Sequence, residues 1–202
     1  MIEAPSIAEH HITGNAKLFA NRYDMVDSLC NRSWDTVVEV GVAFGDFSKF
    51  LIRKMQPKRF VAIDTFVLTE DGECMGKPVS GKLNGMDHEA FFRQQVPEAE
   101  VIKALSFVGL AQVEGDLDFV YLDAGHTYEE IAQDLDVATR KLAPRGCIVV
   151  NDYVIGDTVH MPGAGEYGVV RAVNEMVTNG GWKITGFALE KNMYCDIALR
   201  RG

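Results

Sequence analysis

Short apolar runs alternate along the chain with longer stretches in which apolar residues recur at a helical period. The runs have the β-branched and aromatic content of buried strands, and each longer stretch has one apolar face. Strands that alternate with helices in this way form a parallel sheet with helices on both faces. The predicted strands begin at Thr36, Arg59, Glu100, Leu117 and Gly146, and helices are predicted near residues 7–29, 47–55, 87–95, 127–142 and 166–179.

The C-terminal end departs from this alternation. Two strand-like stretches, 181–190 and 192–201, follow the last helix and are separated only by a short turn near Lys191. A connection this short joins antiparallel strands. The sequence therefore predicts a doubly wound α/β fold with a mostly parallel, seven-stranded sheet and an antiparallel last strand.

Two glycine-rich segments, 65–86 and 154–166, fit neither a strand nor a helix. Loops of this length in a compact domain usually carry function. Both follow predicted strands, so they are expected at the carboxyl edge of the sheet, where open α/β folds bind ligands. We expect a single domain over residues 1–202, with an N-terminal helical segment over about 1–32 and these two insertions near a ligand site.

Composition narrows the class of partner. The chain has 202 residues, of which 47% are hydrophobic, enough for one sizeable core. A net charge of -9 disfavours nucleic acid and anionic membranes and leaves a small-molecule acceptor or a protein as partner. Four widely spaced cysteines and the lack of an apolar leader indicate a cytoplasmic protein. The N-terminal helical segment is a candidate lid or an interface for a homo-oligomer.

A strand-to-helix turn carries the first candidate site. The sequence VVEVGVAFGDF places Glu39, Gly41 and Gly45 at this turn, where glycine lets a ligand approach the backbone. Asp64 ends the next predicted strand, a position from which a carboxylate can accept both ribose hydroxyls of an adenosine. Together these residues predict a nucleoside cofactor.

The turn also indicates which nucleoside. A dinucleotide site needs G-x-G-x-x-G, whereas residues 41–45 read G-V-A-F-G, and the acidic Glu39 would repel a pyrophosphate. An acidic group suits the ammonium and sulfonium of S-adenosylmethionine. The turn resembles the E-x-G-x-G-x-G motif of class I methyltransferases, with Ala43 at the middle glycine. The resemblance covers nearly the whole chain and implies a Rossmann-like fold with Ser106 near the adenine.

The stretch L-D-A-G-H-T-Y-E-E over residues 122–130 carries the second candidate site. Thr127 and Glu130 form a capping box that begins the following helix. Capping does not explain Asp123 or His126, which precede the helix at the edge of the sheet. Asp123 is expected to contact the cofactor as well.

A third acidic group is expected beside these residues, because the next predicted strand ends in Asn151 and Asp152. Strand tips in a sheet are about 4.8 Å apart, so Asp123, Asn151 and Asp152 can converge on one point. Three oxygen ligands suit Mg²⁺. The sequence therefore predicts a magnesium site next to His126.

The spacing from Asp123 to the Asn151–Asp152 pair resembles that of divalent-metal-dependent O-methyltransferases acting on catechols and on macrolide sugars. The resemblance implies O-methylation of a hydroxyl on a small molecule, a sugar or another secondary metabolite, with His126 as general base. Relatives have Asp-Asn or Glu-Asp where this chain has Asn-Asp. A hydroxyl must lose its proton to attack a sulfonium methyl, and both a cation and an imidazole promote that loss.

Three alternatives remain open from the sequence. They are a metal-independent methyltransferase of the same fold, a nicotinamide-dependent oxidoreductase, and a binding module that has kept the cofactor fold without catalysis. The lack of G-x-G-x-x-G disfavours the oxidoreductase. Tyr153 and His160 are candidates for acceptor contact.

Overall fold

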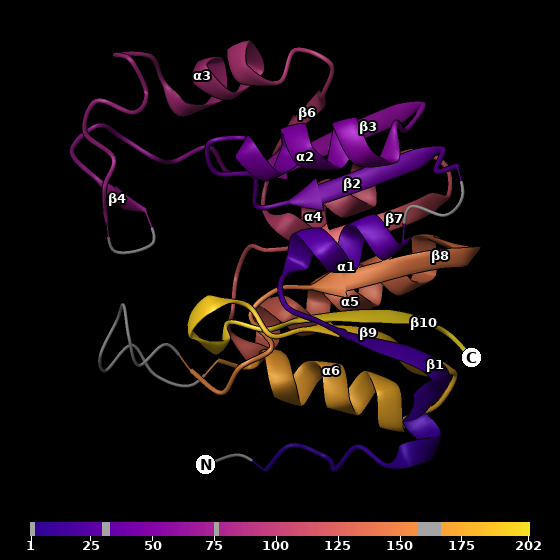
Figure 1. Ribbon diagram of the computed structural model, residues 1–202. Coiled ribbons are helices and arrows are strands. Elements are labelled where there is room, and N and C mark those ends of the chain that lie inside the picture. The colour runs from indigo at the N-terminus through magenta and orange to yellow at the C-terminus, as the bar shows by residue number, and fades with distance from the viewer. Residues whose placement is uncertain (1–2, 30–32, 75–76, 157–166) are drawn as a thin grey trace.

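A computed structural model describes residues 3–29, 33–74, 77–156 and 167–202, which form a layered α/β structure (Figure 1). Its main sheet has eight strands in the order β1-β9-β10-β8-β7-β2-β3-β6. The strands are β1 (Ile12–Phe19), β2 (Thr36–Val40), β3 (Arg59–Asp64), β6 (Glu100–Lys103), β7 (Leu117–Leu122), β8 (Leu142–Val150), β9 (Trp182–Ala188) and β10 (Asp196–Arg201).

The direction of the strands confirms the predicted topology. Every strand of this sheet runs parallel to its neighbours except β10, which is antiparallel to both β8 and β9. The turn predicted near Lys191 is a short 3-10 helix, Lys191–Met193. The carboxyl ends of β2, β3, β6 and β7 therefore meet at one edge of the sheet.

The N-terminal segment corrects the prediction. The helix expected over residues 7–29 is restricted to α1 (Arg22–Leu29), which follows a 3-10 helix, Glu9–His11, and strand β1. Strand β1 pairs in parallel with β9, with a register shift between Ile12 and Lys17, and it raises the strand number from the predicted seven to eight. Pairing with the edge of a distant strand outweighs the local helical pattern here.

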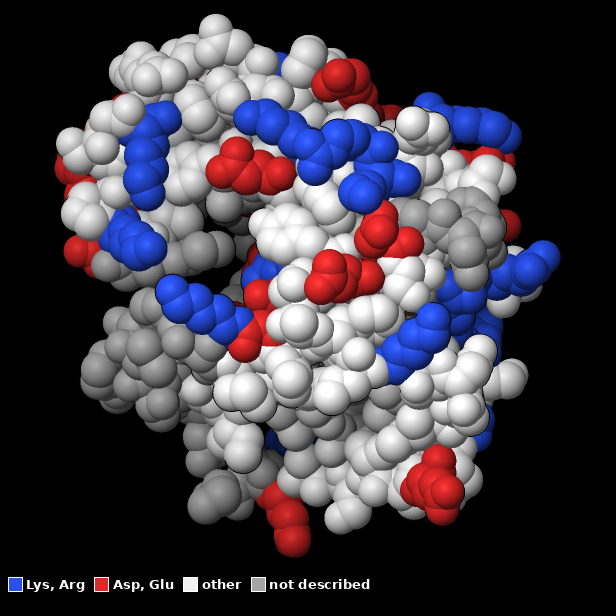
Figure 2. Space-filling view, viewed as in Figure 1, with Lys and Arg blue, Asp and Glu red and all other residues white. Residues whose placement is uncertain are grey.

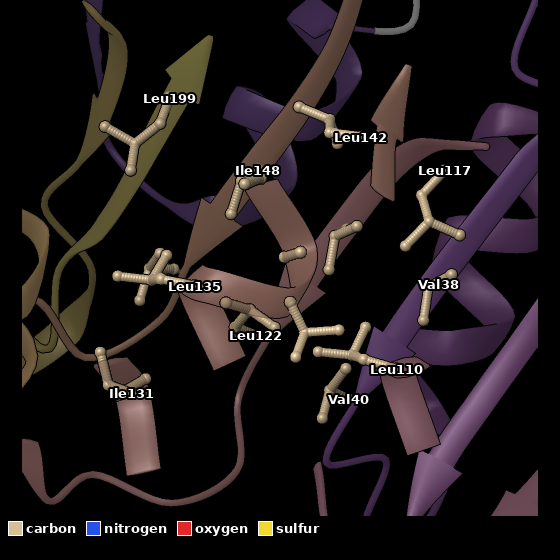
Figure 3. Packing of buried hydrophobic residues seen from close by; sticks show 14 of the residues in the cluster. Val38, Val40, Leu110, Leu117, Leu122, Ile131, Leu135, Leu142, Ile148 and Leu199 are labelled. Atoms are coloured by element: carbon tan, nitrogen blue, oxygen red, sulfur yellow. The ribbon is translucent and has the colours of Figure 1, made fainter. Parts of the chain in front are cut away.

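Helices cover both faces of the sheet, as predicted. α1, α2 and α3 pack on one face, where Val37 and Phe119 point, while α4, α5 and α6 pack on the other, where Val38 and Val120 point (Figures 1 and 3). No helix in the described parts of the chain is long and apolar enough to cross a membrane. The remaining bounds are α2 (Asp46–Met55), α3 (His88–Gln95), α4 (Ser106–Gln112), α5 (Tyr128–Lys141) and α6 (Val169–Thr178).

The insertion at 65–86 is a small packed lobe rather than an open loop. It contains two short antiparallel strands, β4 (Glu73–Cys74) and β5 (Lys77–Pro78), and its own apolar cluster of Val79, Leu83 and Phe91. Because Phe91 belongs to α3, the cluster fastens the insertion to the edge of the domain. Most of the second predicted insertion, residues 157–166, lies outside the described residues.

One buried carboxylate opposes the stability of the core. Asp134 of α5 is fully buried, and neither of its oxygens has a hydrogen bond of good geometry to any described residue. Burial raises the pKa of Asp134 to about 6, although the Ser106 hydroxyl acts in the opposite direction. Ionised Asp134 therefore destabilises the folded state through its desolvation cost. This cost is fully present above pH 6 and decreases as the pH falls towards about 4, the pKa of Asp134 in the unfolded chain.

The turn after β2 depends on the absence of a side chain at Gly41. Gly41 has a φ of +81°, and a Cβ at this position would lie 1.7 Å from the carbonyl oxygen of Asp123. The amide of Gly41 donates to the carbonyl of Ile63 at 2.8 Å, and the amide of Asp123 donates to Val40 at 2.8 Å. Three strand tips are thus fixed against one another at this glycine.

We predict that Asp134→Asn stabilises the protein at pH 8 by about 1–3 kcal/mol, because it removes a buried charge. The gain should nearly disappear at about pH 3, below the unfolded pKa of about 4, where Asp134 is protonated in both states. Urea unfolding at both pH values measures the difference. Asp136→Asn is the matched control, since this carboxylate is exposed on the same helix. A gain that is equal at both pH values would contradict the prediction.

We predict that Gly41→Ala lowers the free energy of unfolding by about 3 kcal/mol or more, because a methyl group would overlap a backbone oxygen. Gly81→Ala is the matched control. Gly81 also has a positive φ, of +76°, but nothing lies within 4 Å of an added Cβ. Gly81→Ala should lower the free energy of unfolding by about 1 kcal/mol, from backbone strain alone. Thermal or urea unfolding of both variants tests the contrast, and similar losses would contradict it.

Candidate functional site

A cavity of about 410 Å³ opens at the carboxyl ends of β2, β3, β6 and β7. The surface is hollowed beneath the lobe that carries α3 and β4 (Figure 2). Side chains of this lobe, Val67, Leu68 and Cys74, form one wall. The opposite wall comes from the segment 123–126, so the cavity lies where the sequence predicted a ligand site.

The structure brings most of the predicted cofactor residues to this cavity. Four of these residues line the cavity, one near the carboxyl end of each of four neighbouring strands, in the spatial order β7, β2, β3 and β6. These residues are Asp123, Gly41, Asp64 and Ser106.

The carboxylate of Asp64 supports the turn as well as facing the cavity. One oxygen accepts from the amides of Val42 at 2.9 Å and Ala43 at 3.4 Å, and the other accepts from the amide of Phe66 at 2.8 Å. Ala43 has a positive φ of 42°, and the side chain of His88 bonds its carbonyl oxygen at 2.7 Å. The turn is therefore held in place from both sides before any ligand binds.

Glu39 and Gly45 do not line this cavity, and their contact with a cofactor stays a prediction. Glu39 is buried beneath the turn, where its carboxyl accepts a 2.5 Å hydrogen bond from Ser48. Burial raises the pKa of Glu39 well above its ordinary value. Gly45 packs against Phe92 and Val96 of the neighbouring helix region, so its small size serves packing.

His126 lines the cavity and is held on two sides. Its ring stacks on Tyr167 with a centroid separation of 4.6 Å, and its Nε2 lies 3.3 Å from a carboxylate oxygen of Asp152, an ion-pair contact without hydrogen-bond geometry. Burial acts to lower the pKa of His126, but the Asp152 and Asp123 carboxylates outweigh it and raise this pKa. Tyr167 was not identified from the sequence, because nothing in its local pattern distinguishes it from a core aromatic residue.

Asp123 faces a cation that the sequence did not reveal. The guanidinium of Arg22, at the start of α1, lies 3.5 Å from Asp123 Oδ2. Burial raises the pKa of Asp123 to about 6, the Arg22 charge opposes this shift, and the Asp152 carboxylate adds to it. Two acidic groups and one basic group thus act on each other at the edge of the cavity.

Asn151 belongs to a buried network behind the cavity. Its amide nitrogen donates to one oxygen of Asp196 at 2.8 Å, and the Tyr121 hydroxyl donates to the other at 2.6 Å. Arg22 in turn donates to the Tyr121 oxygen at 2.9 Å. Burial raises the pKa of Asp196 to about 7.

Each of the predicted magnesium ligands contacts another protein group in this arrangement. Asn151 gives its amide to Asp196, Asp152 pairs with His126, and Asp123 faces a guanidinium. Across the described ranges, no three His, Cys, Asp or Glu side chains form a group that could hold a metal ion. The prediction of a Mg²⁺ site at Asp123, Asn151 and Asp152 is therefore not supported.

Of the two candidates for acceptor contact, Tyr153 does not line this cavity. Tyr153 donates a 2.5 Å hydrogen bond to Asn174 of α6 and lines a separate, apolar cavity beside β1 and β9. His160 lies outside the described residues.

Comparison with solved structures shows the fold. An O-methyltransferase from Bacillus cereus in complex with S-adenosylhomocysteine has a TM-score of 0.62 and 16% identity, over 89% of this chain and 78% of that one. The O-methyltransferase TomG from Streptomyces achromogenes, in complex with S-adenosylmethionine, has a TM-score of 0.61 and 16% identity, over 89% and 79%. The N-methyltransferase NodS from Bradyrhizobium japonicum has a TM-score of 0.60 and 12% identity, over 89% and 94%.

Sequence comparison gives the family. No curated protein sequence matches the chain. A family model for the methyltransferase domain matches residues 38–153, more than half of the chain, and this span contains the turn at Gly41, Asp64, Asp123 and His126. With the Rossmann-like sheet and the cavity at its carboxyl edge, this match shows that the chain belongs to the methyltransferase domain family and is an S-adenosylmethionine-dependent methyltransferase.

Proposed function

We propose that this enzyme methylates a hydroxyl oxygen of a small molecule, with His126 as the general base. The observation that carries the proposal is the pairing of His126 with Asp152 at the wall of the donor cavity. A carboxylate at Nε2 orients the imidazole and leaves Nδ1 to receive a proton. Stacking on Tyr167 holds the ring plane.

The order of residues along the cavity supports a methyl donor that binds in an extended conformation across the strand ends. Ser106 at the tip of β6 suits the adenine, and Asp64 at the tip of β3 suits the ribose hydroxyls. Asp123 at the tip of β7 suits the ammonium of the amino-acid end. An ionised carboxylate accepts at about four positions, and Asp64 already accepts from three backbone amides, so it can hold the turn and still bind one ribose hydroxyl.

The reaction needs a proton acceptor next to the attacking oxygen. S-adenosylmethionine supplies a methyl group on a positively charged sulfur. As the oxygen of the acceptor bonds to that methyl carbon, the carbon–sulfur bond breaks and the hydroxyl proton passes to His126 Nδ1. A raised pKa makes the neutral imidazole a stronger base.

The charge of the cavity supports an uncharged or cationic acceptor. Its lining includes Asp64, Asp123 and Glu130, and no lysine or arginine of the described chain lies among the lining residues. A phosphate or carboxylate group on the acceptor would be repelled at short range. A sugar or another hydroxyl compound without an acidic group suits this wall.

The arrangement of the acidic residues favours deprotonation without a divalent cation. Asp123 and Asp152 each face a basic side chain of the protein, Arg22 and His126. In this proposal the His126 imidazole alone deprotonates the acceptor hydroxyl, a step that the sequence pattern assigned to a base and a metal together.

We predict that His126→Ala lowers kcat by about 10²–10⁴-fold, the usual contribution of a general base, while S-adenosylhomocysteine affinity is unchanged. Transfer of a labelled methyl group to a panel of sugars and phenols measures kcat, and calorimetry measures affinity. His10→Ala, in an exposed position, is the matched control.

The pH profile tests the role of Asp152. The base must be neutral, so kcat/KM should fall on the acidic side of a pKa above the ordinary histidine value of about 6.5. Asp152→Asn removes a carboxylate that raises this pKa and should move the acidic limb to lower pH. An unchanged limb in Asp152→Asn, or full activity of His126→Ala, would overturn the proposed base.

We predict that dialysis against EDTA leaves methyl transfer unchanged and that added Mg²⁺ or Mn²⁺ gives no increase. The reason is that the predicted ligands are already engaged by protein groups. Loss of activity in EDTA with recovery on adding Mg²⁺ would contradict this and return Asp123, Asn151 and Asp152 to the role of metal ligands.

A further inference from the structure

Arg22 is a partly buried cation at the point where four distant chain segments meet. It opens α1, and its side chain is only 21% exposed. The guanidinium lies over the rings of Phe47 and Tyr121, at 5.5 Å and 6.0 Å from their centroids. It reaches the Tyr121 hydroxyl at 2.9 Å, Glu190 at 3.5 Å and Asp123 at 3.5 Å.

Among these partners, Asp123 alone lines the donor cavity. The backbone of Asp123 is fixed by its contact with Gly41, whereas the position of its side chain depends on the groups that face the carboxylate. Arg22 and His126 are the two basic groups that act on this carboxylate, and His126 is engaged by Asp152. Arg22 therefore provides the charge that keeps the Asp123 carboxylate ionised and oriented.

We propose that Arg22 is a positioning residue for the amino-acid end of the methyl donor: it fixes the Asp123 carboxylate, and that carboxylate binds the donor ammonium. The proposal rests on the placement of the donor under the proposed function. That placement follows the strand tips, with the adenine at β6, the ribose at β3 and the amino-acid end between β2 and β7.

The surrounding network explains why the contact holds its geometry. Glu190 accepts a hydrogen bond from the backbone amide of Arg22 and faces its side chain, which anchors both ends of the residue. Tyr121 links Arg22 to Asp196, and Asp196 is held by Asn151. The guanidinium is thereby set at a fixed distance from the tip of β7.

Comparing the binding of two ligands shows whether Arg22 acts at the amino-acid end of the methyl donor or only stabilises the fold. S-adenosylhomocysteine contains the ammonium, whereas 5′-methylthioadenosine has the same nucleoside and sulfur without the amino-acid group. Arg22→Met should weaken S-adenosylhomocysteine binding about tenfold or more, the size expected for a charge-assisted contact. Binding of 5′-methylthioadenosine should change less than about twofold, as measured by calorimetry.

The controls separate charge from packing. Arg22→Lys keeps a positive charge but not the planar fork, so its loss of S-adenosylhomocysteine affinity should be smaller than that of Arg22→Met. Arg53→Met removes an exposed arginine that lies over Phe50 on the neighbouring helix and should change neither affinity. If Arg22→Met does not fold, the affinities for the two ligands are compared in Arg22→Lys and Tyr121→Phe instead.

A double-mutant cycle with Asp123→Asn decides between the remaining outcomes. If Arg22 acts through Asp123, Arg22→Met adds no further loss in the Asp123→Asn background. Equal losses for the two ligands, or additive losses in the cycle, would overturn the role of Arg22. If Asp123→Asn alone leaves S-adenosylhomocysteine binding unchanged, the donor placement fails instead, and the two failures are thus distinct.

Discussion

The close approach of Gly41 to the carbonyl of Asp123 is the constraint on which the site depends. A residue with a side chain cannot occupy this position, because its Cβ would lie 1.7 Å from a backbone oxygen. The contact sets the turn after β2 directly against the tip of β7. It therefore fixes the distance between the backbone that faces the cavity and the acidic residue Asp123.

Burial sets the chemistry of the acidic groups around this contact. Removal from water raises the pKa values of Asp123 and Asp196, to about 6 and about 7. The Arg22 guanidinium opposes both shifts. The result is two neighbouring pairs with different roles, one of Arg22 with Asp123 and one of His126 with Asp152.

Several elements could be predicted because their cause is local. The capping box of Thr127 and Glu130 begins α5 as expected, and the apolar runs from Thr36 and Leu117 are buried strands. Strand β1 could not be predicted, since it exists by pairing with β9, about 170 residues further along the chain. The seven-residue helix α4 was also missed, because so short a helix depends on packing rather than on periodicity.

Strand–helix alternation predicted the α/β class and the carboxyl edge as the place of a ligand site, and the position of Gly41, Asp64, Asp123 and His126 after strands marked them as candidates that do line the cavity. Ser106, which also lines it, was expected from the resemblance to class I methyltransferases. What the acidic residues face depends on how the chain packs. Asn151 and Asp152 are adjacent in sequence, yet one bonds Asp196 and the other pairs with His126. Partners such as Arg22, 101 residues from Asp123, are set by packing, which no local pattern encodes.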